Sequence, residues 1–341
     1  MVRLAIMRRT QNGAILAAVC MAGMALAAVA QQKPDPAPPA RPEVDLQSST
    51  SSDPALQESL RLIQLRDYAA ASQAVHAYLA AHASSAEGHF LLGYVLYRED
   101  KPRESLAEYT LGAHFRKPGA NDLAAVAMDY VLLHDDADAD KWLTLATSWS
   151  PENELYWYYL GRTKYNEDHD QAAIDIFRKC LTLAPHDLRA EYNMGLAYAG
   201  LGLEEKAAEA YRTAIEWDVQ AGDRDPQPYL DLGMLLLEQG QAGQALPDLQ
   251  KAVALDAQNP RAREQLGQAW EQLHNLARAD EEMRAAVTLA PNVPSLHFEM
   301  GRIYQKEGLS QEAKAEFDRC AALNATHSTD AEETPNPAPH P

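Results

Sequence analysis

The chain has 341 residues and a formal net charge of −19, and 46% of its residues are hydrophobic while 7% are aromatic. This composition is typical of a folded protein, with enough length for two ordinary domains or one extended array. The acidic balance argues against nucleic acid as a partner, because phosphate binding needs clustered Lys and Arg.

The N-terminal thirty residues have the pattern of an export signal. Three arginines precede an apolar run at residues 13–29, and small residues at 28 and 30 form a cleavage site. The run is short for a bilayer span, which needs about 20 predominantly apolar residues. We therefore predict a cleaved signal peptide over residues 1–30 and an exported protein that is periplasmic, bound to the cell envelope or secreted. An uncleaved signal would instead leave a membrane tether.

Two further segments have the composition of disordered chain. Residues 31–51 contain five prolines and end in a run of Ser and Thr, which predicts a Pro/Ser-rich spacer. Residues 328–341 are rich in Thr, Glu and Pro, and we predict a disordered tail there.

Between these segments, from residue 52 to residue 327, the sequence repeats. Small residues recur at steps of 34, with one step of 38 between Gly195 and Gly233, and large apolar residues recur around them. One set of aligned positions is Gly93, Ala127, Gly161, Gly195, Gly233, Gly267 and Gly301, and another is Ala71, Ser105, Ala139, Ala173, Ala207, Ala245, Ala279 and Ala313. The apolar spacing within each repeat is helical, and breaks near Gly202, Gly240 and Gly308 predict the end of a first helix. Small residues at fixed points indicate that a neighbouring helix lies close against each of them.

The repeated pattern closely resembles the tetratricopeptide repeat family. The segment WYYLGRTKY at 157–165, followed by Ala173, Phe177 and Pro185, matches the family pattern nearly in full. The resemblance implies an all-α fold, a right-handed superhelical solenoid of 34-residue helix-turn-helix repeats. We number the eight predicted repeats in chain order: 52–85, which is divergent, then 86–119, 120–153, 154–187, 188–221, 226–259, 260–293 and 294–327.

The sequence offers little for catalysis. It contains no Gly-rich phosphate loop, nucleophile elbow or zinc-ligand spacing, so we predict no enzyme, no cofactor and no metal. The strongest metal candidate is the acidic run at 135–140, in which we expect Asp136 or Asp138 to cap a helix instead. A metal-binding accessory enzyme built on this run is the least favoured alternative.

The cysteines and two of the histidines also have structural explanations. Cys180 and Cys320 share a register position four repeats apart, whereas a disulfide needs Cα atoms within about 7 Å. We predict that both are free, buried small residues. His89 and His297 occupy an aromatic position of the repeat, and we expect them to pack rather than bind a ligand.

The family resemblance implies that the first helices line a concave groove. The predicted groove residues are Phe90, Tyr94, Tyr97, Met128, Leu132, Tyr158, Arg162, Tyr165, Arg189, Tyr192, Asn193, Leu196, Leu230 and Met234. These apolar and aromatic residues with a few cations are favoured anchors for a partner, although the tyrosines are equally suited to packing between repeats. In repeats 7 and 8 the groove positions turn polar, with Glu264, Gln268, Glu271, Gln272, Arg302, Gln305 and Lys306.

We predict a non-catalytic scaffold that binds an extended peptide or a helix of another protein in this groove. The family's carboxylate clamp for C-terminal peptides is incomplete, because Asn193 matches its middle Asn while Tyr158 and Arg162 replace its first two residues. The main alternative is a structural envelope protein that self-associates through the last repeat, which no capping helix follows. This alternative predicts a homo-oligomer.

Overall fold

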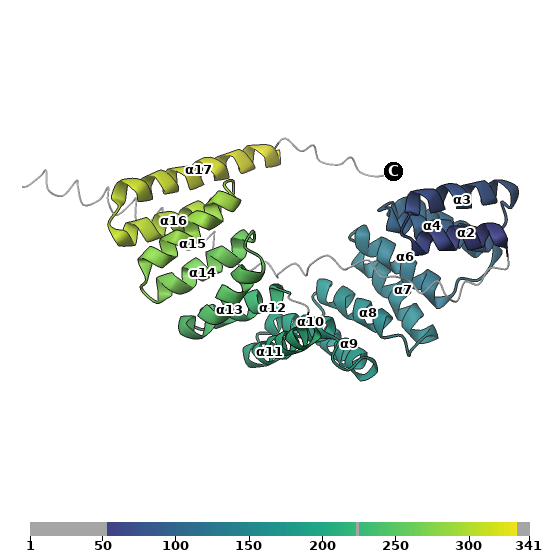
Figure 1. Cartoon of the computed structure of the whole chain (residues 1–341), viewed down its shortest axis with the longest axis horizontal. Coiled ribbons are helices and arrows are strands. Elements are labelled where there is room, and N and C mark those ends of the chain that lie inside the picture. The colour runs from purple at the N-terminus through teal and green to yellow at the C-terminus, as the bar shows by residue number, and fades with distance from the viewer. Residues whose placement is uncertain (1–52, 223–224, 333–341) are drawn as a thin grey trace, which may run out of the picture. The chain divides into compact units, whose positions relative to one another are not determined.

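The computed structural model describes residues 53–222 and 225–332, which form sixteen α-helices and no strand (Figure 1). The predicted all-α class of helix-turn-helix repeats is therefore confirmed. The predicted signal peptide at 1–30 and spacer at 31–51 lie outside the described residues. Among the helices of the described ranges, none has the length and apolarity that a membrane span requires.

The described chain falls into two compact parts, residues 53–217 and residues 218–332. The helices of the first part are α2 (Pro54–Gln64), α3 (Tyr68–Ala81), α4 (Ala86–Arg98), α5 (Pro102–Phe115), α6 (Ala120–Leu132), α7 (Asp136–Trp149), α8 (Glu154–Asn166), α9 (Asp170–Leu183), α10 (Leu188–Gly200) and most of α11 (Glu204–Ala221). Those of the second part are α12 (Gln227–Glu238), α13 (Ala242–Leu255), α14 (Pro260–Gln272), α15 (Leu276–Leu289), α16 (Pro294–Glu307) and α17 (Ser310–Glu332).

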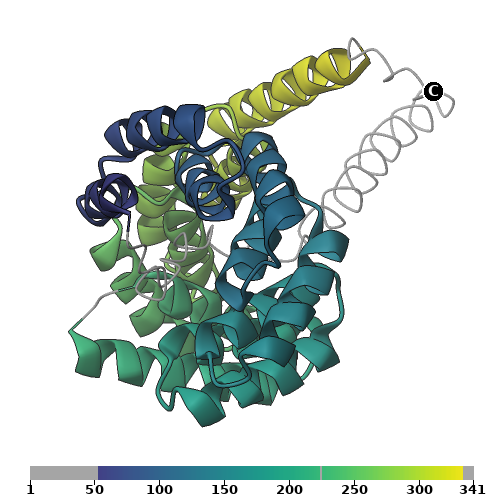
Figure 2. The same cartoon turned by 90° about the vertical axis from the view of Figure 1, so that its right-hand side faces the viewer.

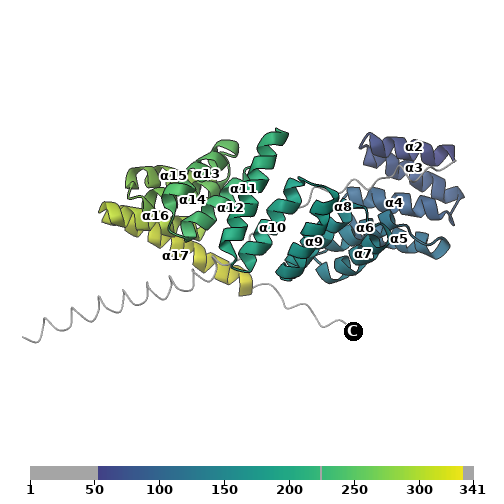
Figure 3. The same cartoon turned by 90° about the horizontal axis from the view of Figure 1, so that it is seen from below.

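Within each part, helices pack in pairs that correspond to the predicted repeats. The two helices of a repeat contact each other, as in α4 with α5 and α14 with α15, and the second helix then contacts the first helix of the next repeat. Figures 2 and 3 show these pairs from two further directions. First helices of adjacent repeats also touch, in α4 with α6, α8 with α10 and α12 with α14. Each part is therefore a stack of helix pairs, as expected for a solenoid.

The small residues that recur in each repeat lie where a neighbouring helix packs closely, as predicted. A Cβ atom added to Gly161 would lie 2.5 Å from Phe177 on the second helix of its repeat. One added to Gly195 would lie 2.6 Å from Tyr211. Both distances are below van der Waals contact, so a large second-helix side chain occupies the space above each glycine.

The turn between the two helices of a repeat shows the same period in its backbone. Eight residues have a positive φ, between 57° and 81°. They recur at steps of 34, with one step of 38. These residues are Arg66, Asp100, His134, Asp168, Gly202, Gly240, His274 and Gly308. This left-handed conformation favours glycine, yet only three of the eight are glycine. The three glycines were predicted as breaks at the end of a first helix, whereas the other five positions were not predicted.

One side chain near the start of several first helices joins its helix to the loop that precedes the repeat and to the second helix of the same repeat. In His297 the ring Nε2 lies 2.9 Å from the Pro291 carbonyl oxygen of the preceding loop, and Nδ1 lies 2.7 Å from Glu316 Oε2 on the second helix. His89 makes the same two contacts with Ala83 and Glu108, at 3.0 and 2.7 Å. The predicted packing role of both histidines is thus accompanied by hydrogen bonds.

Arg263 reproduces this contact with a different side chain. Its Nε donates to the Ala257 carbonyl oxygen at 3.0 Å and its Nη1 to Glu282 Oε2 at 2.8 Å. At the same repeat position, Trp157 donates from Nε1 to the Pro151 carbonyl oxygen at 2.9 Å. We call this arrangement the loop clip: a side chain that is hydrogen-bonded to the loop six residues back and, in three of these four cases, to a glutamate nineteen residues on.

The second helices of repeats 5 and 8 are longer than the others, at 18 and 23 residues. Helix α11 continues to Ala221, the predicted end of repeat 5, because the first helix-breaking residue is Gly222 with a φ of 80°. Helix α17 continues to Glu332, five residues past the end of the last predicted repeat, where the sequence holds neither glycine nor proline.

Candidate functional site

The fourteen predicted groove residues lie on the first helices α4, α6, α8, α10 and α12, and eleven of them are buried. The buried residues are Phe90, Tyr94, Tyr97, Met128, Tyr158, Arg162, Tyr165, Tyr192, Asn193, Leu196 and Leu230. Leu132 and Met234 are half-buried, and Arg189 is exposed. Their burial accords with the packing role that the sequence left open.

Several buried aromatic residues stack on a partner within their own repeat. The ring of Phe90 lies 6.0 Å from that of Tyr109, and the ring of Tyr192 lies 5.8 Å from that of Tyr211. Tyr158 lies 6.3 Å from Phe177 in the same register. Such pairs favour the folded state beyond the area they bury. Sequence could not separate this role from binding, because both require aromatic residues at these positions.

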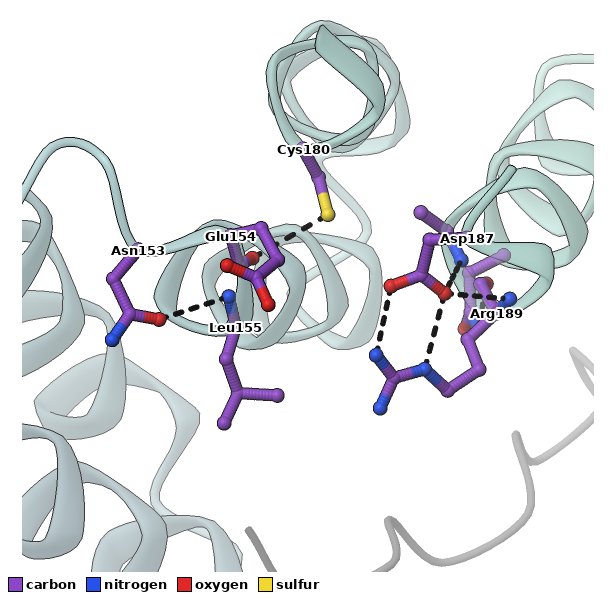
Figure 4. Close-up of polar contacts among 8 residues, drawn as sticks. Asn153, Glu154, Leu155, Cys180, Asp187 and Arg189 are labelled. Carbon is purple, nitrogen blue, oxygen red and sulfur yellow. Dashed lines mark hydrogen bonds and ion pairs between the residues drawn. The ribbon is translucent and has the colours of Figure 1, made fainter. Parts of the chain in front are cut away.

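Arg189 differs from the rest of the set because its guanidinium is exposed and firmly held. Its Nε lies 3.1 Å from Asp187 Oδ1 and its Nη2 lies 2.8 Å from Asp187 Oδ2 (Figure 4). The guanidinium carbon lies 4.8 Å from the centre of the Tyr158 ring. A two-point ion pair and an aromatic face fix the orientation of an arginine that keeps 46% of its side chain exposed.

Asp187 is a helix cap as well as the partner of Arg189. Its Oδ1 accepts hydrogen bonds from the backbone N–H of Arg189 at 3.0 Å and of Ala190 at 3.4 Å, at the start of α10. The carboxylate thus satisfies free N–H groups of the first helical turn. The hydrogen bonds that Arg189 donates to Asp187 raise the pKa of Arg189, so this residue carries its positive charge throughout the physiological range.

Two other arginines of the first part accompany tyrosines. Arg98 donates from Nη1 to the Tyr94 hydroxyl at 3.0 Å, and its guanidinium carbon lies 4.9 Å from the centre of the Tyr68 ring. Arg162 is buried and hydrogen-bonded to Tyr158. First helices α4, α8 and α10 therefore each bring one cation to a tyrosine-rich face. Arg162 and Arg189 belong to the predicted groove set, and Arg98 occupies a groove-facing position of the same repeat register.

Asn193 lies one turn beyond Arg189 on α10 and is buried. Its Nδ2 donates to the Arg189 backbone carbonyl oxygen at 2.8 Å, so the nitrogen of the side-chain amide has a partner. Its Oδ1 makes no hydrogen bond within the described ranges 53–222 and 225–332. A buried acceptor without a donor costs free energy, and this oxygen is closed to solvent.

Cys180 and Cys320 are free and buried, as predicted. The thiol of Cys180 donates a hydrogen bond to the Glu154 carbonyl oxygen at 3.4 Å, beside the start of α8 (Figure 4). Burial raises the pKa of Cys180 to about 12, which keeps it in the unreactive thiol form. Cys180 is therefore a packing residue and has no nucleophilic character at neutral pH.

The acidic run at 135–140 is divided among separate partners. Asp135 caps α7 by accepting from the Asp138 backbone N–H at 3.1 Å, so the expectation that Asp136 or Asp138 would be the cap is wrong. The cap falls on Asp135 because α7 begins at Asp136, so Asp136 and Asp138 both lie within the helix. Asp140 pairs instead with Lys164 at 2.9 Å. In residues 53–222 and 225–332, no group of three or more His, Cys, Asp or Glu side chains is placed to hold a metal ion.

The fold and the faces of the first helices define a helical repeat protein. Family models described as "Tetratricopeptide repeat" match the chain at residues 56–121 and 230–294, and at 156–187, 188–218 and 294–327. Together these matches cover more than half of the sequence. The chain belongs to the tetratricopeptide repeat family, whose members mediate protein–protein interactions.

Similar proteins extend this result for parts of the chain. A human "PEX5-related protein" is 24% identical over 124 residues, 36% of this chain and 17% of its own length. A "Peroxisomal targeting signal receptor" of Kluyveromyces lactis is 33% identical over 66 residues, 19% of this chain and 12% of its own length. The chain thus matches less than a fifth of the length of either relative.

Solved structures with the same fold cover more of the chain. A tetratricopeptide repeat protein from Parabacteroides merdae has a TM-score of 0.56 at 16% identity and covers 73% of this chain and 97% of its own. The Cut9–Hcn1 hetero-tetramer of the APC/C has a TM-score of 0.54 at 17% identity, covering 82% of this chain and 54% of its own. At these identities the likeness concerns the fold alone.

Proposed function

We propose that this protein is a non-catalytic scaffold that binds an extended peptide or a helix of another protein on the face formed by its first helices. The observation that carries this proposal is the exposed Arg189, held by Asp187 above the ring of Tyr158. Membership of a family of interaction modules supports it, as do relatives whose name describes a receptor for a targeting signal. We further propose that the scaffold acts in the periplasm or cell envelope, on the strength of the export pattern in residues 1–30.

The chemistry of this arginine suits a peptide backbone. Asp187 engages Nε and Nη2, which leaves Nη1 on the exposed edge of the guanidinium. An oriented guanidinium donates well to a carbonyl or carboxylate oxygen, and it loses little entropy on binding because it is already fixed.

The test uses peptides selected from a displayed random library for binding to the full chain. We compare Arg189→Ala, which leaves Asp187 to cap α10, with Arg212→Ala, a matched control at an exposed arginine of α11. Selected peptides should lose about tenfold or more in affinity for the Arg189→Ala variant, equivalent to about 1.4 kcal/mol. The Arg212→Ala variant should bind like the native protein, and circular dichroism should show equal helix content in all three.

Equal binding by the two variants would place recognition elsewhere and overturn the site. Buried members of the predicted groove set, such as Tyr165 and Leu196, are unsuitable for this test, because each is only 1% exposed. Their replacement by charged residues would unfold the repeat and remove binding for a reason unrelated to contact.

A further inference from the structure

The C-terminal ends of the second helices in the first compact part carry a row of large apolar residues. Phe115 is the last residue of α5 and Trp149 the last residue of α7, and their exposed fractions are 46% and 38%. They occupy one register position, which in the next two repeats holds Leu183 and Trp217, both half-buried. In the second compact part the same position holds leucine in every repeat. We call Phe115, Trp149, Leu183 and Trp217 the edge row.

Trp149 combines an open aromatic surface with an unused hydrogen-bond donor. The ammonium of Lys117, in the loop before α6, lies 4.2 Å from the centre of the Trp149 ring and holds the ring from one side. The indole Nε1–H of Trp149 has no acceptor among residues 53–222 and 225–332. Trp157 differs, because its Nε1–H donates to Pro151. A tryptophan with a free N–H and an exposed face is suited to binding another segment of chain.

The chain that precedes the described fold enters at the same edge. The two helices of a repeat are antiparallel and joined by a short turn, so a first helix starts where the second helix ends. The start of α2 at Pro54 therefore lies at the edge that carries the edge row. Residues 43–53 link Pro42 to α2 and span up to about 36 Å when extended. Trp149 lies two repeats on from α2, at about 10 Å per repeat, and so is within reach.

Residues 36–42 have a proline period that fits the edge row. Pro36, Pro39 and Pro42 recur every three residues. A polyproline II helix has three residues per turn and rises by about 3.1 Å per residue, which would place these prolines on one side at intervals of about 9 Å. Equivalent side chains of adjacent repeats are about 10 Å apart. One proline can therefore rest on Phe115 while the next rests on Trp149, as proline-rich segments do on aromatic surfaces.

We propose that residues 36–42 of this chain dock on its own edge row as a polyproline II segment. Prolines of the segment cover the rings of Phe115 and Trp149, and the Trp149 Nε1–H donates to one of its carbonyl oxygens, which have no partner within a polyproline II helix. Such a segment loses little entropy on docking, because proline already restricts it. The contact covers exposed apolar surface and uses residues that have no part in the proposed function.

The first test is fluorine nuclear magnetic resonance of the full chain labelled with 5-fluorotryptophan, in which Trp149→Phe identifies the Trp149 signal. The segment variant replaces four prolines, and the tail variant replaces the four prolines of the C-terminal tail, which recur every two residues instead of three. Both sets lie outside the described helices, so neither disturbs their packing. The changes are Pro36→Ser, Pro38→Ser, Pro39→Ser and Pro42→Ser in the segment variant, and Pro335→Ser, Pro337→Ser, Pro339→Ser and Pro341→Ser in the tail variant.

We expect the segment variant to shift the Trp149 signal and to make it broaden more strongly with a soluble paramagnetic reagent. The Trp157 signal should stay in place, and the tail variant should match the native protein. An unchanged Trp149 signal in the segment variant, or an equal change in the tail variant, would overturn the proposal. A Trp149 signal that varies with protein concentration would place the segment of a second copy on the row, and would overturn docking within one chain.

A labelled peptide with the sequence of residues 35–43, capped at both ends, gives a second readout by fluorescence anisotropy. The tethered segment competes at an effective concentration on the order of 1 mM, so the peptide should bind the segment variant about tenfold more tightly than the native chain. Adding Trp149→Ala to the segment variant should remove this binding. Adding Leu203→Ala, at a leucine 39% exposed on the opposite edge, should not. Equal affinity for the native chain and the segment variant, or equal effects of the two added substitutions, would reject the edge row as the docking site.

Discussion

Ser105 Oγ lies 2.5 Å from Asp129 Oδ2 and 2.8 Å from the backbone carbonyl oxygen of Gly93, so one hydroxyl hydrogen faces two acceptors. Both side chains are fully buried, at the contact of α5 with α6. Burial raises the pKa of Asp129 to about 8, and the hydrogen bond with Ser105 opposes this rise. A proton on Asp129 completes the arrangement: the carboxyl donates to Ser105, and Ser105 donates to Gly93.

This buried proton makes stability depend on pH. The unfolded chain releases the Asp129 proton near the ordinary value of 3.8, whereas the folded protein keeps it up to about pH 8. Stability is therefore highest at low pH with respect to this group and falls as the pH rises through that window, by up to about 1.4 kcal/mol per pH unit. Asp129→Asn keeps the shape and supplies a permanent donor to Ser105. We expect it to raise stability near pH 8 and to flatten the slope.

Urea unfolding of both proteins at a series of pH values measures this difference. Glu191 and Glu264 also have pKa values raised to about 7 by burial, so the native protein has other contributions to its slope. Subtracting the Asp129→Asn curve isolates one group. Parallel curves for the two proteins would show that Asp129 is ionised in the folded state and that our assignment of the proton is wrong.

The repeat glycines provide a matched pair of substitutions. Gly161→Ala places a methyl group 2.5 Å from the fully buried Phe177, and we expect a loss of about 1–3 kcal/mol from overpacking. At the equivalent position, a methyl group on Gly267 would lie 3.4 Å from its nearest atom, in ordinary contact. Gly267→Ala should therefore gain up to about 1 kcal/mol from helix propensity. Chemical unfolding of both variants tests this; equal effects would mean that Phe177 yields to the methyl group.

The left-handed turns predict substitutions that stabilise the protein. His134 and His274 have φ values of 57° and 59°, a region that costs a residue with a side chain about 1–2 kcal/mol. Glycine avoids this cost but loses more entropy on folding. The net stability of His134→Gly and of His274→Gly should therefore rise by up to about 1 kcal/mol each. The control is His76→Gly in the middle of α3, which should lose about 0.5 kcal/mol. Thermal unfolding separates the two directions, and a loss in all three variants would contradict the argument.

The sequence predicted the fold better than the candidate site, for a physical reason. A solenoid repeats its packing, so the spacing of Gly195, Ala207 and their equivalents reports directly on which helices touch. The left-handed conformation of the turns was harder to predict from the sequence, because five of the eight positions hold residues other than glycine, such as Arg66. The surrounding helix pair imposes that conformation, and local composition does not record it.

Predicting the candidate site required knowing which groove residues are buried, and the spacing of residues in the sequence does not show this. Tyr158 and Arg189 both occupy groove positions, yet one is buried against Phe177 and the other exposed. Arg189 stays exposed because its ion pair with Asp187 holds the guanidinium against the outer side of the Tyr158 ring. An Asp two residues before an Arg at a helix start is a weak signal in sequence, because its capping role alone accounts for it.

The loop clip leads to the last prediction, an exchange of residue types between repeats. Arg263 joins Ala257 and Glu282 through the same two contacts that His297 makes with Pro291 and Glu316. Arg263→Leu removes both donors and leaves the mostly buried Glu282 unpaired, so we expect a loss of about 1–3 kcal/mol. Arg263→His should retain most of the stability at about pH 6, where an imidazole readily carries both ring protons.

Arg319→Leu, at an exposed position of α17, controls for lost charge and should change stability by less than about 0.5 kcal/mol. If Arg263→His costs as much in urea unfolding as Arg263→Leu, the shared geometry of the clip contributes nothing to stability, and the two contacts are independent products of local packing.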